Sequence, residues 1–203
     1  MIKLDHEQGT PEWFAARIGL PSASNFKKII TSTGKASTSA STYMLDLLSE
    51  LVTGAKTEGA TNEWMQRGIE LEYDAVGLYE MLYDVDTEES GFILHNSRRF
   101  GCSPDRLIGK DGGLEIKCPK PSTHMKYLLG GKCPTEYYPQ VMGCMLVTDA
   151  KWWDFMSYHP EIKPLIVRVQ RNDEYINKMR LQVFQFCDKL DEKLNQYKSI
   201  EDK

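Results

Sequence analysis

The sequence predicts an α/β (α+β) domain in which a small mixed β-sheet is flanked by helices, and three observations indicate this class. Apolar residues recur at three- and four-residue steps over residues 62–83, which is the period of an amphipathic helix. After residue 90 the period changes, and short runs bounded by turn residues are typical of strands. With 203 residues, 41% of them hydrophobic and 27% charged, the chain fits one globular domain over residues 1–203.

The first third of the chain is expected to be helical. Thr10, Pro11 and Glu12 supply a capping hydroxyl, a proline at the first position and an acid in the first turn, so a short helix should end near residues 17–18. A second helix is expected from Ser22 or Ser24. The polar residues 31–41 are predicted to form a mobile loop before a third helix that stops at Gly54. The apolar residues assigned to the second and third helices are Phe26, Ile29, Ile30, Tyr43, Leu47, Leu48 and Leu51.

The helix predicted over residues 62–83 places Glu72 at the edge of its buried stripe, where a side chain can face a cleft. The stripe consists of Trp64, Gly68, Leu71, Ala75, Leu78 and Leu82. The remaining elements follow from changes of period and from turn residues. We expect strands at 91–95, 100–102, 106–108 and 114–117 with a turn at 110–113, helices at 122–129 and 135–146, strands at 152–158 and 165–170, and a helix over 173–197.

Composition excludes several classes of protein. The amino terminus lacks the apolar segment of a signal peptide, and no run reaches the ~18 apolar residues of a membrane span, so we expect a cytoplasmic protein without a membrane partner. The five cysteines include no C-x-x-C pair, which favours reduced, mostly buried thiols over disulfides or a zinc site. The absence of a P-loop motif argues against an ATP-driven motor.

Charge is distributed unevenly along the chain. The net charge is −4, yet residues 98–132 hold eight basic residues against three acids, and residues 68–97 hold eight acids and no basic residue. A basic surface within an acidic whole suits a polyanion bound at one place. Two ordinary solvated faces would give the same pattern.

Residues 101–121, GCSPDRLIGKDGGLEIKCPKP, place charges in a predicted hairpin. Glu115 and Lys117 share one face of a strand, Ile116 points to the other, and the hairpin returns Asp105 beside Glu115. Paired carboxylates with the Ile116 carbonyl offer the oxygen ligands that Mg²⁺ or Mn²⁺ prefers, and Lys117 beside the metal can position and help deprotonate a water. Solvent-exposed charges on a hairpin are the alternative interpretation.

Four ordered stretches resemble the PD-(D/E)XK nuclease superfamily, and in detail the bacteriophage lambda exonuclease family of YqaJ-like viral recombinases. They are PEWFAARIGLPSAS (11–24), RGIELEYDA (67–75), SPD with LEIKCP (103–105 and 114–119), and YYPQVMGCMLVT (137–148). The resemblance, which spans nearly the whole chain, implies a core like that of restriction endonucleases.

The resemblance also implies roles for single residues. Asp105, Glu115 and the Ile116 carbonyl match its metal ligands, and Lys117 matches its catalytic lysine. Glu72 matches its helical glutamate, a ligand to a second metal directly or through water, with Glu70 as the rival position. Gln140 matches a glutamine beside the metals that can contact the scissile phosphate; alternatively, it caps a neighbouring backbone group.

The amino-terminal motif can form an anion pocket. Arg17 can hold a phosphate bidentately, and the Ser22 or Ser24 hydroxyl with free helix amides can complete the pocket. In the resembled family such a pocket binds the 5′-phosphate of the digested strand, with the residue matching Ser103. Alternatively, Arg17 forms a salt bridge with Glu12 or Asp5, and Ser24 is an ordinary helix cap.

Other candidates have weaker support. The four histidines, His6, His95, His124 and His159, lack metal-ligand spacing and are expected to be structural or solvated. His124 and Lys126 follow the predicted catalytic strand and are candidates for contact with the DNA backbone. Trp152 and Trp153 are expected to pack in the core or a subunit interface.

The function implied by the resemblance is a Mg²⁺-dependent 5′–3′ exodeoxyribonuclease with two ions per site, for which Mn²⁺ can substitute. It digests one strand of linear double-stranded DNA from a 5′-phosphorylated end and leaves a 3′ single-stranded overhang. A homotrimeric ring, a single-strand annealing protein as partner, and a phage or prophage origin in a bacterial host are further implications. The alternatives are a structure-specific or restriction-type endonuclease of the same superfamily and a non-catalytic module that binds DNA ends.

Overall fold

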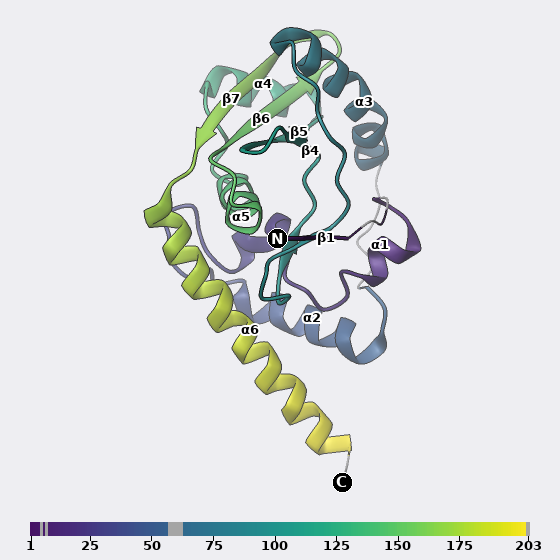
Figure 1. The fold of residues 1–203 in the computed structure, drawn as a ribbon, viewed down its shortest axis with the longest axis vertical. Coiled ribbons are helices and arrows are strands. Elements are labelled where there is room, and N and C mark those ends of the chain that lie inside the picture. Colours follow the sequence, from purple (N-terminus) through teal and green to yellow (C-terminus); the bar gives the residue numbers. More distant parts are fainter. Residues whose placement is uncertain (5, 7, 57–62, 202–203) are drawn as a thin grey trace.

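The computed structural model describes residues 1–4, 6, 8–56 and 63–201 and has a mixed α/β architecture (Figure 1). Its main sheet has the strand order β4-β5-β6-β7. The β5 and β6 strands are parallel and the other neighbours are antiparallel, which confirms the predicted mixed sheet. The strands are β4 (Arg106–Ile108), β5 (Gly112–Lys117), β6 (Trp152–His159) and β7 (Ile162–Gln170).

Helices cover both faces of this sheet. Because successive strand residues point to opposite faces, Leu114 and Ile116 pack with Ala75 and Tyr79 of α3 (Glu63–Tyr83) on one side. Trp153 belongs to the larger core on the other side, which includes most of α5 (Tyr138–Thr148). Figure 1 shows α3 and α5 flanking the sheet. The sheet therefore separates two cores, and its β4–β5 edge lies between them.

The amino-terminal third forms a second layer that supports α5. It contains α1 (Pro11–Ala15), the 3₁₀-helix η1 (Ala23–Lys28) and α2 (Ala40–Thr53). The predicted first helix is therefore too long, and the second is a 3₁₀-helix rather than an α-helix. The stop at Gly54 is confirmed by its left-handed φ of 67°. A small antiparallel sheet lies beside this layer, with β1 (Ile2–Lys3), β2 (Ile93–Leu94) and β3 (Gly101–Cys102) in that order.

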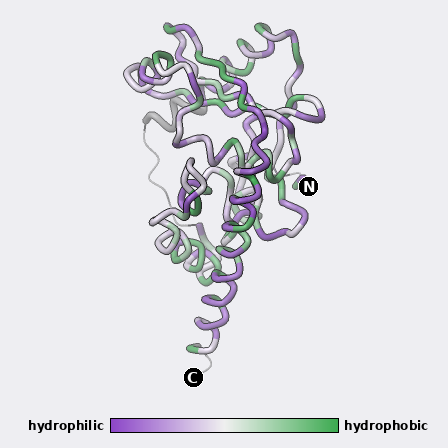
Figure 2. Tube along the Cα trace, turned by 90° about the vertical axis from the view of Figure 1, so that its left-hand side faces the viewer, coloured by the Kyte–Doolittle hydropathy of each residue, from purple (hydrophilic) through white to green (hydrophobic). Residues whose placement is uncertain are grey.

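The chain closes with α4 (Pro121–Gly130) before α5 and a long carboxy-terminal helix, α6 (Asp173–Glu201). The buried residues of α6 run from Tyr175 to Leu190, and its last turns extend beyond the body of the molecule (Figure 1). Figure 2 shows that this projecting end is mostly hydrophilic. Within the described part of the chain, no helix is both long enough and apolar enough to cross a membrane.

The predicted buried stripe of α3 needs correction. Leu82 is 53% exposed, whereas Val76 and Tyr79, which the prediction omitted, are buried with Ala75. The Trp64 and Gly68 side chains lie outside the described side chains. The buried face of α3 therefore runs through Ala75, Val76 and Tyr79 and does not include Leu82.

The predicted hairpin turn is also displaced. Gly112 and Gly113 already belong to β5, paired with Ile108 and Leu107, and the turn lies over residues 109–111. A Cβ at Gly112 would lie 2.1 Å from the ring of Trp152, and one at Gly113 would lie 2.4 Å from the ring of Trp153. The two glycines therefore provide space for the tryptophan rings of β6, and the expectation of core packing is confirmed for Trp153.

Candidate active site

The register of the β4–β5 hairpin places Asp105 at the edge of β5. Arg106 pairs with Leu114, so Asp105 precedes the paired residues and lies next to the position of Glu115. Its Oδ2 accepts a 2.6 Å hydrogen bond from the backbone N–H of Ile116. The N–H and C=O of one strand residue project to the same edge, so the Ile116 carbonyl also faces the Asp105 side. The second carboxylate oxygen of Asp105 remains for another ligand.

Glu115 is fully buried on the α5 face of the sheet. Its Oε1 accepts a 2.6 Å hydrogen bond from Nε2 of Gln140 and forms an ion pair with Nζ of Lys117. Gln140 therefore contacts the candidate site directly and does not cap a backbone group through this amide. The other oxygen, Oε2, is buried and has no hydrogen-bond partner. An unpartnered buried carboxylate oxygen is unfavourable unless it meets a proton or a cation.

Burial and crowding of charge shift the acid–base properties of this cluster. Burial, reinforced by the charge of Asp105, raises the pKa of Glu115. Burial alone would lower the pKa of Lys117, but the charges of Glu115 and Asp105 outweigh it and raise that pKa above its ordinary value. The cluster therefore holds more negative charge than Lys117 neutralises, which is the electrostatic condition for binding a cation.

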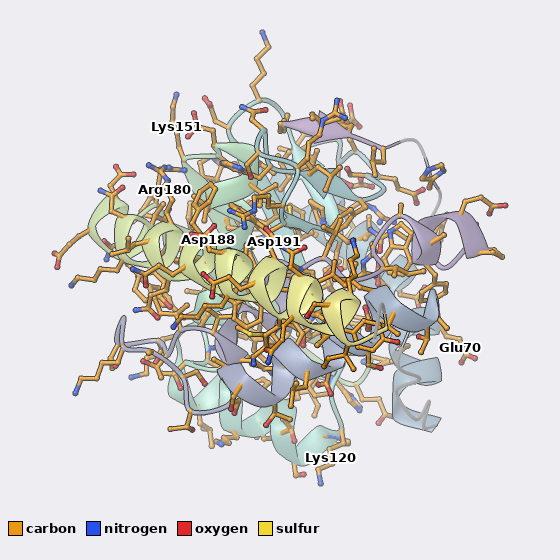
Figure 3. All side chains as sticks on the ribbon, turned by 90° about the horizontal axis from the view of Figure 1, so that it is seen from below. Glu70, Lys120, Lys151, Arg180, Asp188 and Asp191 are labelled. Atoms are coloured by element: carbon orange, nitrogen blue, oxygen red, sulfur yellow. The ribbon has the colours of Figure 1, made fainter. Side chains whose placement is uncertain are left out.

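Glu72 approaches the same edge from α3, on the opposite face of the sheet. Its carboxylate forms an ion pair with Arg106 at 3.5 Å and is 36% exposed. Burial and the nearby charge of Asp105 raise its pKa to about 7. Glu70 is exposed and points away from the body of the molecule (Figure 3). The structure thus directs Glu72, and not Glu70, toward the carboxylates of the hairpin.

The donor set suits a hard divalent cation. Carboxylates of Asp105 and Glu115 with a backbone carbonyl are oxygen ligands, and the unpartnered Oε2 of Glu115 is the atom that a cation would satisfy. Over the ranges that the structure describes, no three His, Cys, Asp or Glu side chains gather closely enough to hold a metal ion.

Arg17 lies in an aromatic environment. Its guanidinium stacks 3.8 Å from the ring centre of Trp13 and lies 5.5 Å from that of Phe92. Its Nε is buried without a hydrogen-bond partner, and burial lowers its pKa. Asp5, one of the alternative salt-bridge partners, lies outside the described residues. A stacked, preoriented guanidinium with a free donor is suited to binding an anion.

The predicted anion pocket also includes three serines, Ser22, Ser24 and Ser103. Ser22 precedes η1 without capping it through its side chain, and its Oγ lies 3.1 Å from that of Ser24. An isolated bridge joins Ser22 to Gly101, two residues before Ser103, whose Oγ is buried without a partner. The 3₁₀-helix η1 has only six residues, and the backbone N–H of Asn25 already donates to the Ser22 carbonyl. The serine hydroxyls are therefore better placed than the helix amides to donate hydrogen bonds to an anion.

One interpretation of the sequence is wrong. His124 is fully buried, with Nδ1 2.7 Å from Ser157 Oγ and Nε2 3.0 Å from the Lys163 carbonyl, so it joins α4 to β6 and β7 and is not available to DNA. Lys126 is exposed. Sequence reasoning also missed Arg106 as a site residue, although its place directly after Asp105 was a usable signal.

The chain is similar to known proteins along most of its length. The model of the YqaJ-like viral recombinase domain matches residues 12–151. An alkaline exonuclease (LHK-Exo) from Laribacter hongkongensis is 33% identical, with a TM-score of 0.87 over 95% of this chain and 98% of that one. The same enzyme in complex with dAMP is 34% identical, with a TM-score of 0.86 over the same shares.

A third structure shows the fold alone. A phage-related exonuclease from Haemophilus somnus 129PT has 17% identity and a TM-score of 0.70 over 88% of this chain and 96% of that one. No curated protein sequence matches the chain. The fold is of the PD-(D/E)XK type, and the similarity to an alkaline exonuclease indicates a nuclease. The chain belongs to the YqaJ-like viral recombinase family.

Proposed function

We propose that this protein is a Mg²⁺-dependent exodeoxyribonuclease that digests one strand of linear double-stranded DNA, 5′ to 3′, from a 5′-phosphorylated end. The product would be a 3′ single-stranded overhang for recombination by strand annealing. The observation that carries the proposal is the convergence of Asp105 and Glu115 beside Lys117, with Glu115 Oε2 buried and unpartnered. Family membership and similarity to an alkaline exonuclease along nearly the whole chain support it.

Two divalent ions are proposed for each site. Asp105, Glu115 and the Ile116 carbonyl would hold one Mg²⁺, and Glu72 would contribute to the second, with Mn²⁺ able to replace both. When bound, the ions would supply positive charge that activates water and stabilises the leaving 3′-oxygen.

The protein's own side chains would orient the reaction. Gln140 fixes the direction of the Glu115 carboxylate through its 2.6 Å hydrogen bond, and it would also contact the scissile phosphate. Lys117 Nζ, next to Glu115, would orient the attacking water. Because its raised pKa keeps it protonated in the metal-free protein, it would take the water's proton only after the divalent ions have replaced it as counter-charge to Glu115. Both act from rigid elements, because Lys117 ends β5 and Gln140 lies in the first turn of α5.

The end of the digested strand would be held by Arg17, Ser22, Ser24 and Ser103. The buried, unpartnered Arg17 Nε and Ser103 Oγ support this assignment, since a phosphate oxygen would satisfy both donors. Release of mononucleotides is supported by the complex of the Laribacter enzyme with dAMP, a mononucleotide.

Assembly and partners follow from the family in this proposal. We expect a homotrimeric ring around the DNA, which would give processivity without ATP, and a single-strand annealing protein that receives the overhang. The family name, a viral recombinase, supports a phage or prophage origin and action inside a bacterial host. Sedimentation equilibrium tests the assembly: a mass three times that of the 23.3 kDa chain is expected.

The reaction is tested with linear duplex DNA labelled on either strand and carrying 5′-phosphates. We expect digestion with Mg²⁺, none with EDTA, and earlier release of the 5′ label than of the 3′ label. Covalently closed circular DNA of the same sequence should survive. Equal survival of linear DNA with and without Mg²⁺ would indicate a non-catalytic end-binding module, and equal cutting of circles would indicate an endonuclease.

A further inference from the structure

Arg106 lies between two carboxylates from different parts of the chain. Its Nη1 lies 3.5 Å from Oε1 of Glu72, and its Nη2 donates a 3.0 Å hydrogen bond to Oε1 of Glu89. Nη1 also donates a 2.6 Å hydrogen bond to the carbonyl of Asp105. The side chain of Arg106 is only 13% exposed, whereas that of Glu89 is 80% exposed. The guanidinium is therefore well ordered by its contacts and borders the candidate metal site.

Both carboxylate partners are held in place by the fold. Glu72 projects from α3, which is packed on the sheet. Glu89 follows Glu88, which exchanges two 2.8 Å backbone hydrogen bonds with Leu107 along the outer edge of β4. The distances from Arg106 to its two partners thus depend on sheet pairing and helix packing, and small movements of the guanidinium decide which carboxylate it favours.

Oε1 of Glu72 already has a cationic neighbour, the guanidinium of Arg106. A divalent ion that uses this oxygen must therefore displace the guanidinium or share the oxygen with it at short range. Two positive groups on one carboxylate repel each other strongly where water is partly excluded. Arg106 therefore competes with a cation that Glu72 would bind through Oε1.

The structure also provides a place for the displaced guanidinium. A cavity of about 260 Å³ beside α3 is lined by Arg106 with Tyr73, Val76, Gly77, Glu80, Thr87 and Glu89. Movement toward this cavity would keep the hydrogen bond to Glu89 while lengthening the contact with Glu72. The guanidinium would thus keep one carboxylate partner, Glu89, when the ion pair with Glu72 is lost.

We propose that Arg106 is a displaceable counter-ion: in the metal-free protein it bridges Glu72 and Glu89, and it releases Glu72 while keeping Glu89 when a second divalent cation binds Glu72. This inference rests on the proposed two-ion site. Arg106 acts as a positioning residue, and its effect is to make the second ion bind more weakly than the first. Occupancy of the second position then depends on how strongly Glu89 retains the guanidinium.

Titration of the DNA-free protein with Mn²⁺, with free Mn²⁺ measured by electron paramagnetic resonance, tests the proposal without any activity. We expect a tighter and a weaker site, with Glu72→Gln removing the weaker one. Arg106→Gln should tighten the weaker site about tenfold, which corresponds to about 1.4 kcal/mol. Glu89→Gln should weaken it about threefold, because the displaced guanidinium then loses the carboxylate to which it is hydrogen-bonded.

The double variant separates displacement from general electrostatics. If Arg106 mediates the effect of Glu89, Glu89→Gln changes nothing in the Arg106→Gln background, whereas simple charge effects would add. Glu88→Gln is the matched control for a neighbouring acid, since Glu88 pairs with Lys3. Arg99→Gln is the control for a lost arginine, because Arg99 pairs with Asp188 and Asp191, which extend from the same side of α6 (Figure 3).

Three outcomes would overturn the inference. Additive effects in the double variant, or an unchanged second site in Arg106→Gln, would reject the displacement while leaving the proposed nuclease intact. Should Arg106→Gln fail to fold, the single variant Glu89→Gln, altered at an exposed position, still decides: an unchanged weaker site rejects the displacement. Absence of all Mn²⁺ binding in the wild type would instead reject the proposed metal site itself.

Discussion

Asp105 and Ile116 are joined by a 2.6 Å hydrogen bond from the backbone N–H of Ile116 to Oδ2 of Asp105. This bond joins the carboxylate of Asp105, which lies before β4, to β5. Glu115 and Lys117 project from one face of β5, and the Ile116 side chain projects from the other. One Asp105 oxygen is thereby committed to the backbone, and the other is oriented toward the edge of β5. The site is consequently organised before any ligand binds, which reduces the entropy lost on binding.

Replacing Lys117 with alanine should lower the rate of cleavage by at least about a hundredfold, the usual effect of removing a general base. Binding of DNA should change little, because backbone contacts are distributed over many groups. Single-turnover digestion and fluorescence anisotropy in Ca²⁺ measure the two effects separately. Lys120→Ala, an exposed lysine at the start of α4, is the control. Wild-type turnover by Lys117→Ala would remove the lysine from the mechanism.

Arg17→Ala should remove the preference for a 5′-phosphorylated end and leave slower digestion of a 5′-hydroxyl end unchanged. The guanidinium is stacked on Trp13 and has a free buried donor, so its loss removes a preoriented contact. The measurement is the ratio of initial rates on matched duplexes that differ only in this phosphate. The control is Lys27→Ala, an exposed residue of η1. A retained phosphate preference in Arg17→Ala would place the end pocket elsewhere.

Metal binding should release protons near neutral pH. Burial and the charge of Asp105 raise the pKa of Glu72 from 4.5 to about 7 in the metal-free protein. The folded state therefore holds this proton more tightly than the unfolded state, so this group's contribution to stability is greatest below pH 4.5 and declines as pH rises toward 7. A cation favours the ionised form and expels the proton.

Calorimetric titration with Mg²⁺ at pH about 6.5, in buffers with different ionisation enthalpies, detects this proton release. The heats should differ between buffers, and Glu72→Gln should reduce the difference. Identical heats in all buffers would show that no carboxyl group in the site is protonated before the metal binds.

Gly113→Ala should destabilise the protein by about 2–3 kcal/mol through overpacking. A Cβ at this position would lie 2.4 Å from the ring of Trp153, which is fully buried and has no space to move. Gly77→Ala is the matched control, because nothing lies within 4 Å of its Cβ and it lies within α3. That substitution should stabilise the protein by up to about 1 kcal/mol. Urea unfolding measures both changes, and a neutral Gly113→Ala would contradict the packing explanation.

The sequence predicted those parts of the fold that local chemistry determines. The 3.6-residue period located α3 and α6, and the glycine at residue 54 ended α2 as expected. The alternation of Glu115, Ile116 and Lys117 followed from strand geometry alone. These features depend on neighbours within a few residues, so a single sequence is sufficient to show them.

Features that depend on tertiary contacts were missed. Gly112 and Gly113 resemble turn residues in the sequence, but glycine is needed there because the tryptophan rings of β6 lie against them. Those tryptophans are about forty residues away in sequence and become neighbours only through the parallel pairing of β5 and β6. The sequence does not exclude His124 as a candidate for contact with DNA, because its two hydrogen bonds come from β6 and β7. Arg106 was counted as part of a basic region, since nothing local shows that Glu72 and Glu89 meet it.

The most direct test of the central claim is anomalous diffraction from crystals soaked in Mn²⁺. We expect an anomalous peak within coordination distance of the free Asp105 oxygen, Glu115 Oε2 and the Ile116 carbonyl, and loss of that peak in Glu115→Gln. No peak at these oxygens, with DNA bound and Mn²⁺ in excess, would contradict this claim.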